Sequence, residues 1–195
     1  MKKESVLLVF FVLLFVVSIS MLVLVNSQIT GHATSIGTTS NVTLINSLSI
    51  DLSTNLAEGI MFGKLSSTGT YNNNATHNYD GVSNVSTMFV NVSADSSVNV
   101  DLCLNANQSL ISEGGDIIDI GNETWANSSI NTLEDPALGE RRAFTLSGVK
   151  TGVDVAKGSS NYYRFWLDIP LGQKAGTYSN NVTFEGVATG ESCAV

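Results

Sequence analysis

The chain has 195 residues, with 9 Lys and Arg against 17 Asp and Glu, so its formal net charge is −8. This acidic balance argues against nucleic-acid binding, because contacts to phosphates need a cationic surface. Hydrophobic residues make up 43% of the chain, which excludes an intrinsically disordered protein and leaves enough apolar material for a core.

Residues 1–25 form a hydrophobic N-terminal segment. Lys2 and Lys3 precede an apolar run over residues 6–25, which only two serines interrupt. As a helix, this run would be about 30 Å long, the thickness of a bilayer core. Lysines on its N-terminal side predict that the following chain is translocated. The segment is therefore interpreted as an uncleaved signal anchor that contacts the membrane through residues 6–25, or as a cleaved signal peptide.

Residues 26–40 are small and polar and show no periodicity, which is typical of a linker or stalk. Residues 41–195 are then expected to form one ectodomain. Within it, runs with period-two alternation predict strands that have one buried and one solvated face. The predicted strands are residues 44–52, 59–65, 85–93, 97–104, 117–120, 142–149, 161–169 and 177–187.

These seven or eight short strands are separated by spacers rich in Gly, Asn and Ser, and no helical period follows residue 26. Such a pattern predicts an all-β fold, an antiparallel β-sandwich of Ig-like or jelly-roll-like type after one N-terminal hydrophobic helix.

The strongest chemical signal is the Asn-x-Ser/Thr sequon. Eight occur, about twice the number expected from a random order of the same residues. A glycan needs open space, and the predicted strands and loops place most of these asparagines outward. We therefore predict N-glycosylation at Asn41, Asn74, Asn84, Asn91, Asn107, Asn122, Asn127 and Asn181.

Cys103 and Cys193 are the only cysteines. In a translocated chain they are expected to pair, and the bridge would close a loop of about 90 residues. Two free thiols or an intermolecular link remain the alternatives.

No catalytic constellation is found, and we expect a protein that is not an enzyme and has no cofactor. The two histidines, His32 and His77, lie in the stalk and in an Asn-rich loop, away from any nucleophile motif. No zinc-ligand spacing occurs. An acidic, glycine-containing loop offers a weak Ca²⁺ alternative, although its spacing does not match an EF-hand. Its carboxylates are Glu113, Asp116, Asp119 and Glu123.

Aromatic residues suggest one possible binding surface. Trp125 lies between two sequons, and Tyr162 and Trp166 share one face of a predicted strand. These rings could form a sugar-stacking or subunit-contact surface. The alternative is that the strand is covered on both faces and the rings belong to a second layer of core.

The hydrophobic segment, the residues Ile29 to Ala33 after it, and a final hairpin over residues 165–184 resemble archaeal secreted surface proteins. These are small, sequon-rich β-sandwiches, including pilus- or thread-like fibre subunits and envelope glycoproteins. The resemblance implies that an N-terminal strand could complete the sheet of a neighbouring subunit. Residues 42–52 have the length and alternation for such a donor strand, and they suit pairing within their own domain equally well.

We therefore expect a non-enzymatic, N-glycosylated protein of the cell surface or extracellular space, membrane-anchored or secreted, with a structural role in the envelope. A polymerising fibre subunit and a carbohydrate- or surface-binding adhesion module are the alternatives. The expected partners are the membrane, further copies of the chain in a fibre or envelope lattice, and glycans.

Overall fold

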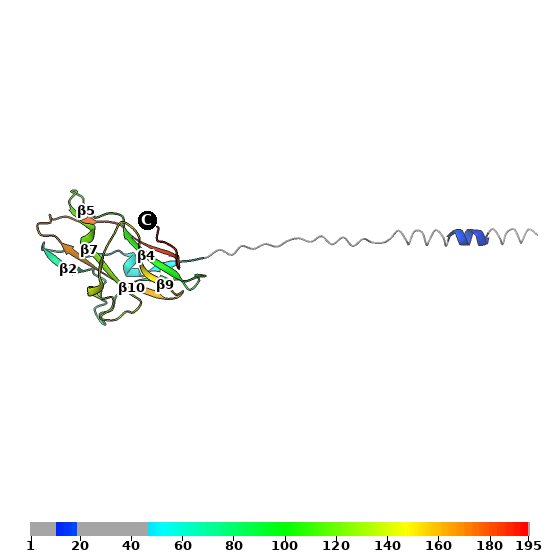
Figure 1. Cartoon of the computed structure of the whole chain (residues 1–195), viewed down its shortest axis with the longest axis horizontal. Helices are drawn as coiled ribbons and strands as arrows, with labels where there is room; N and C mark the ends of the chain where they lie inside the picture. The colour runs from blue at the N-terminus through cyan, green and yellow to red at the C-terminus, as the bar shows by residue number, and fades with distance from the viewer. Residues whose placement is uncertain (1–10, 19–46, 195) are drawn as a thin grey trace, which may run out of the picture. The chain divides into compact units, whose positions relative to one another are not determined.

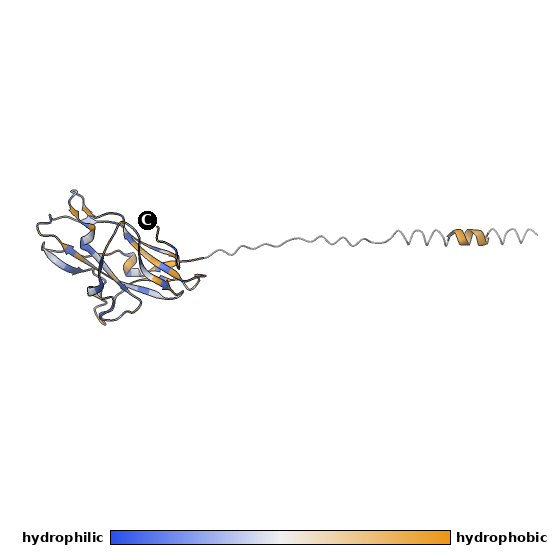
Figure 2. Cartoon of the chain, in the orientation of Figure 1, coloured by the Kyte–Doolittle hydropathy of each residue, from blue (hydrophilic) through white to orange (hydrophobic). Residues whose placement is uncertain are grey.

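The computed structural model describes residues 11–18 and 47–194. The chain divides into two units, residues 1–43 and 44–195. In the first, residues 11–18 are helical, and all of them except Ser18 are hydrophobic (Figure 2). No helix within these described ranges is long and apolar enough to cross a bilayer. Most of the predicted membrane segment, the stalk and Asn41 lie outside the described residues.

Residues 47–194 form a β-rich domain (Figure 1). Its strands are β1 (Ile50–Leu52), β2 (Thr70–Asn74), β3 (Met88–Val92), β4 (Val100–Ala106), β5 (Leu110–Ser112), β6 (Ile117–Ile118), β7 (Glu123–Ser128), β8 (Arg142–Ala143), β9 (Val149–Val155), β10 (Ser160–Ile169), β11 (Tyr178–Ser179) and β12 (Val182–Ala188). One helical turn, α2 (Thr54–Ala57), and two 3₁₀ turns, η1 (Ile120–Asn122) and η2 (Leu138–Glu140), complete the elements.

Three antiparallel sheets organise these strands. Sheet 1 has the order β1-β3-β10-β7-β8, and β2 pairs with the C-terminal half of β10 beside β3. Sheet 2 has the order β12-β4-β9, and a small third sheet has the order β11-β5-β6. The prediction of an all-β antiparallel sandwich is confirmed, although the strands are more numerous and shorter than expected.

The core lies between sheets 1 and 2. The inward residues of β3 and β4 and the two inward aromatic rings of β10, Tyr163 and Phe165, form one buried cluster. A smaller cluster joins β5 and β6 to the end of β10. Alternate residues of β3, β4 and β10 supply these side chains, as the period-two pattern predicts. The buried members of the main cluster include Met88, Val90, Val92, Val100, Leu102, Leu104, Ala106, Trp125, Tyr163 and Phe165.

The outer face of sheet 1 is covered by loops. Arg164 on β10 is 2% exposed, and its guanidinium donates hydrogen bonds to five backbone carbonyls. Their donor–acceptor distances are 2.7–3.2 Å. The carbonyls belong to two loops, at Asn78 and Asn84 in one and at Thr132, Leu133 and Pro136 in the other. One buried cation therefore fastens both loops to the middle of the sheet.

A buried asparagine reinforces this cover. Asn78 is fully buried, and its side-chain amide pairs with the backbone of Phe165, donating to the carbonyl at 2.7 Å and accepting from the amide at 2.8 Å. The side chain thus substitutes for a neighbouring strand at this point of β10.

The predicted strand 59–65 is wrong, because these residues have no strand structure. Ile60 and Phe62 do pack against the core, which explains the alternation. Residues 44–46 of the predicted strand 44–52 lie outside the described residues. Within 47–52, only residues 50–52 form β1, and they pair with β3 of the same domain. The predicted strand 142–149 is replaced by the two-residue β8 and the start of β9.

Candidate functional site

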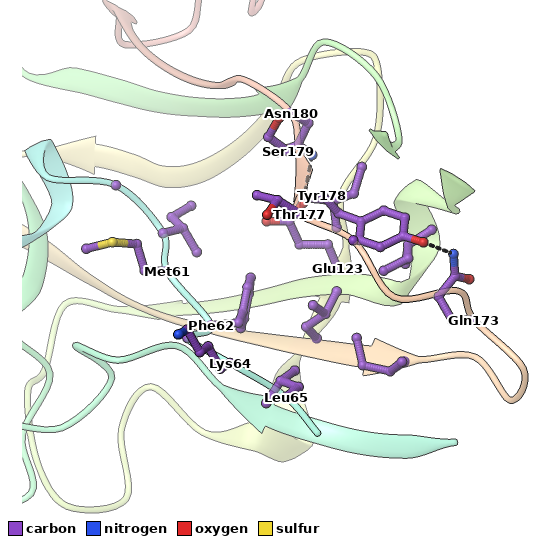
Figure 3. A pocket seen from close by; sticks show the side chains of 18 of the residues that line it. Met61, Phe62, Lys64, Leu65, Glu123, Gln173, Thr177, Tyr178, Ser179 and Asn180 are labelled. Carbon is purple, nitrogen blue, oxygen red and sulfur yellow. Dashed lines mark hydrogen bonds between the residues drawn. The ribbon is translucent and has the colours of Figure 1, made fainter. Parts of the chain in front are cut away.

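A groove of about 820 Å³ opens on the surface of the domain. It opens where the inter-sheet core meets the small sheet, between the irregular segment at residues 59–68 and the segment at residues 173–182. Figure 3 shows Met61, Phe62 and Leu65 on the first segment and Thr177 to Asn180 on the second. Apolar side chains of both core clusters form its floor: Leu110, Ile118, Leu167, Ile169 and Phe184.

Glu123 is a buried carboxyl group beside the apolar floor of the groove. It begins β7 and pairs with Leu167 of β10, so its side chain points into the sandwich. It is 2% exposed, and Asn180 Nδ2 donates a hydrogen bond to its Oε2 at 2.8 Å. Desolvation by burial raises the pKa of Glu123 above its usual value, and the hydrogen bond from Asn180 only partly opposes this.

The segment at residues 173–182, the second wall of the groove, is held in place by its own hydrogen bonds. The Tyr178 hydroxyl donates to the carbonyl of Lys174 at 2.8 Å and accepts from Gln173 Nε2 at 2.8 Å, the latter drawn in Figure 3. Lys174 Nζ lies 2.6 Å from Asp116 Oδ1. The hydrogen bond and the charge of Asp116 raise the pKa of this exposed lysine.

The segment at residues 59–68, the first wall of the groove, has free main-chain amides. Among the hydrogen bonds of residues 47–194, none is donated by a main-chain amide of residues 60–68. Main-chain amides that pair with nothing in the protein are available to an added extended chain as well as to water. The groove therefore combines an apolar floor, one buried carboxyl group and a stretch of backbone whose amides are unpaired.

The aromatic surface predicted from Trp125, Tyr162 and Trp166 is wrong. Trp125 pairs with Phe165 and faces the inter-sheet core, whereas Trp166 is on the opposite face of sheet 1, under the loops. Both indoles are at most 2% exposed. Tyr162 is half-buried, with its ring 5.6 Å from that of Phe89. The alternative, that both faces of β10 are covered, is what the structure has.

The acidic loop is not assembled into a calcium site, and that alternative is wrong. No group of three or more His, Cys, Asp or Glu side chains gathers in the described ranges. Asp116 pairs with Lys174, and Asp119 caps η1 by accepting from the Gly121 amide at 2.9 Å. Glu123 points into the groove, and Glu113 is exposed. Each carboxylate is thus directed to a different place.

His77 lies at the edge of the domain, with Nε2 3.8 Å from Glu58 Oε2. His32 lies outside the described residues.

The predicted disulfide is confirmed. Cys103 and Cys193 are bonded, and the bridge ties the C-terminal tail across the outer face of sheet 2. Beneath the tail lies Asp101, which is 1% exposed. It accepts hydrogen bonds from Lys150 Nζ at 2.6 Å, the Asp154 amide at 2.8 Å and the tail amide of Gly190 at 3.1 Å.

Opposing effects act on the pKa of Asp101. Desolvation by burial, the largest single effect, acts to raise it. The hydrogen bonds from Asp154, Lys150 and Gly190, together with the charge of Lys150, outweigh desolvation, so the pKa of Asp101 is lowered. The carboxylate therefore stays ionised under the tail.

The sequons fall into distinct environments. Asn74, Asn84, Asn107 and Asn181 are exposed, and Asn91 and Asn122 are half-buried. Asn127 is also half-buried; it belongs to β7 and pairs with Tyr163 of β10.

Comparison with models of protein families, with curated proteins and with solved structures finds no match to this chain.

Proposed function

We propose that this chain is a non-enzymatic, N-glycosylated protein of the cell surface or extracellular space, membrane-anchored or secreted, with a structural role in the envelope. The single observation that carries the proposal is the bond between Cys103 and Cys193. Structural disulfides belong mainly to exported proteins, because cytosolic thiols are kept reduced. The N-terminal apolar run and the four exposed sequons support the same compartment.

Mass spectrometry of the full chain, isolated from cells that export and glycosylate proteins, tests this proposal. We expect a non-reduced peptide that joins Cys103 to Cys193, and glycan mass on several sequon peptides. Material found only in the cytosol, with both thiols free and no modified asparagine, would refute it.

The groove favours a second candidate, self-association into a fibre by addition of an extended segment. Its apolar floor and the unpaired amides of residues 60–68 offer both contacts that strand addition uses. The occupant is the predicted donor strand, residues 42–52, of a second copy. The last three residues of this donor strand form β1, which pairs with β3 of its own domain. Exchange between copies must therefore break three residue pairs between β1 and β3.

A charge placed in the groove tests this candidate. Leu65→Glu changes a half-exposed groove residue and is expected to keep the protein monomeric in sedimentation and free of filaments in electron micrographs. Val82→Glu changes a residue that is 88% exposed and outside the groove, and it should assemble like the parent. A parent protein that stays monomeric at all concentrations, or equal assembly of the two variants, removes the candidate.

A further inference from the structure

The side chain of Asn127 is half-buried and lies between the two sheets. Because Asn127 pairs with Tyr163, its side chain points to the same side as that ring, which is the inter-sheet core. Its Nδ2 donates to the carbonyl of Thr151 on β9, in sheet 2, and to Asn161 Oδ1 at 3.4 Å. The amide therefore bridges the two sheets.

The acceptors of Asn127 belong to a closed polar network. The hydroxyl groups of Thr151 and Tyr163 lie 2.6 Å apart, and Asn161 Nδ2 donates to the Tyr163 hydroxyl at 2.9 Å. These three residues are at most 6% exposed. Burial raises the pKa of Tyr163 to about 12, so its hydroxyl stays protonated at physiological pH. The network that accepts from Asn127 is therefore buried and internally hydrogen-bonded.

Nδ2 is the atom that an N-glycan modifies. Glycan attachment replaces one of its two hydrogens with a sugar, which must then extend into solvent. At Asn127 both hydrogens point at protein acceptors across the sandwich. A sugar here would separate β7 from β9 and expose the network, so the native fold and a modified Asn127 are incompatible.

Asn107 and Asn181 offer the opposite geometry. Both are exposed, at the adjoining ends of β4 and β12. The Asn181 amide donates to Asn107 Oδ1 at 2.9 Å, which uses the oxygen of that side chain and leaves its nitrogen free of hydrogen bonds within residues 47–194. The side chain of Asn181 makes no hydrogen bond in that range. Both nitrogens are open to an attached sugar.

We propose that the folded protein carries N-glycans at Asn107 and Asn181, and that Asn127 is a structural sequon that stays unmodified. This inference rests on the proposed glycoprotein function and deepens it, because it assigns sites within the set of predicted sequons. It also gives the Asn127 side chain a structural role, the hydrogen-bonded bridge between the two sheets.

Two serine and threonine substitutions test the assignment without changing an asparagine. Ser129→Ala destroys the Asn127 sequon, and Thr183→Ala destroys that of Asn181; both hydroxyl residues are exposed. The full chain is produced in a host that exports and N-glycosylates proteins, and intact mass and peptide maps are recorded. We expect Ser129→Ala to change the mass only by its lost oxygen, and Thr183→Ala to lose one whole glycan.

The peptide maps separate the possible failures. Glycan on the Asn127 peptide of folded protein overturns the inference while leaving the glycoprotein function intact. If Asn107 and Asn181 are unmodified while other sequons carry glycans, the assignment of glycans to these two sites is overturned and the glycoprotein function is not. No glycan on any peptide overturns both.

A stability measurement tests the structural role independently of glycosylation. Asn127→Asp keeps the shape but turns an oxygen toward the Thr151 carbonyl, and the melting temperature of unglycosylated protein should fall by about 5 °C or more. Ser129→Ala, the matched control, should melt within about 1 °C of the parent. Equal melting temperatures for Asn127→Asp and the parent would overturn the structural role.

Discussion

Arg164 differs from most buried charges because its partners are carbonyl dipoles. Five backbone carbonyls from two loops accept its hydrogen bonds, and the Tyr79 ring lies 4.5 Å from its Cζ. Desolvation lowers the pKa of Arg164, but a guanidinium remains charged at any physiological pH. A planar group with five N–H donors suits this task, which a lysine could fill only in part.

Arg164→Met should therefore be among the most destabilising substitutions in the domain. It leaves five carbonyls without their donor, and we expect a loss of about 3–5 kcal/mol in the free energy of unfolding, measured in urea. Arg142→Met, which removes an exposed guanidinium 5.8 Å from the Trp125 ring, should cost less than about 1 kcal/mol. Similar losses for the two variants would contradict the role given to Arg164.

Glu123 should make stability depend on pH in the opposite sense to a paired carboxylate. Its pKa is raised in the folded protein, so its favourable contribution is complete below the unfolded value of 4.5 and is lost as pH rises through the folded value. Glu123→Gln removes this titration. The melting temperature of the Glu123→Gln variant, relative to that of the parent protein, should rise as pH increases from about 4 to 8. A difference that stays constant over this range would show that Glu123 does not titrate abnormally.

At the scale of elements, the period-two pattern predicted side-chain burial better than backbone pairing. It located β3, β4 and β10, where alternate residues enter the core. The same pattern at residues 59–65 reflects Ile60 and Phe62 packing inward without a neighbouring strand. β2 was missed because its sequence, TYNNN, is polar on both faces, and β7 because Glu123, Trp125 and Asn127 mix charged, aromatic and amide groups on one inward face.

The groove could not have been predicted from sequence. Its lining residues come from segments more than 100 positions apart, and the alternation at residues 59–65 and 177–187 predicted strands rather than the walls of a groove. Burial of Glu123 depends on the register between β7 and β10, which single-sequence patterns do not determine. The disulfide, in contrast, could be predicted from two cysteines and an expected translocating segment.

The contact between β1 and β12 limits the size of one residue. A Cβ on Gly186 would lie 2.9 Å from Ile50 Cγ2 and 3.0 Å from Val100 Cγ1. Gly186→Ala should therefore push β1 away from sheet 2, and a loss of about 1–3 kcal/mol in unfolding free energy is expected. Gly139→Ala meets no atom within 4 Å and serves as the control, with a change within about 0.5 kcal/mol. If Gly186→Ala is as stable as Gly139→Ala, the sheets are not in close contact there.

At the scale of the whole domain, the C-terminal tail and the disulfide act together. The bridge joins residues 90 positions apart, which restricts the unfolded chain by about 4–5 kcal/mol on the chain-entropy estimate. The tail also places the Gly190 amide on Asp101 and the Ala194 amide on Glu185. Opening the bridge therefore releases the chain that covers a buried carboxylate.

Cys193→Ser should lower the unfolding free energy by about 3–5 kcal/mol, measured in urea without reductant. Part of this loss should depend on pH, because the freed tail withdraws the Gly190 hydrogen bond from Asp101. The lowered pKa of Asp101 contributes stability that is present above the unfolded value of 3.8 and is lost as pH falls through the folded value. The difference in unfolding free energy between the parent and Cys193→Ser should thus become smaller as the pH falls below about 4. Adding reductant should bring the parent to the stability of the variant and leave the variant unchanged; a reduced parent as stable as the oxidised one would contradict the role of the bridge.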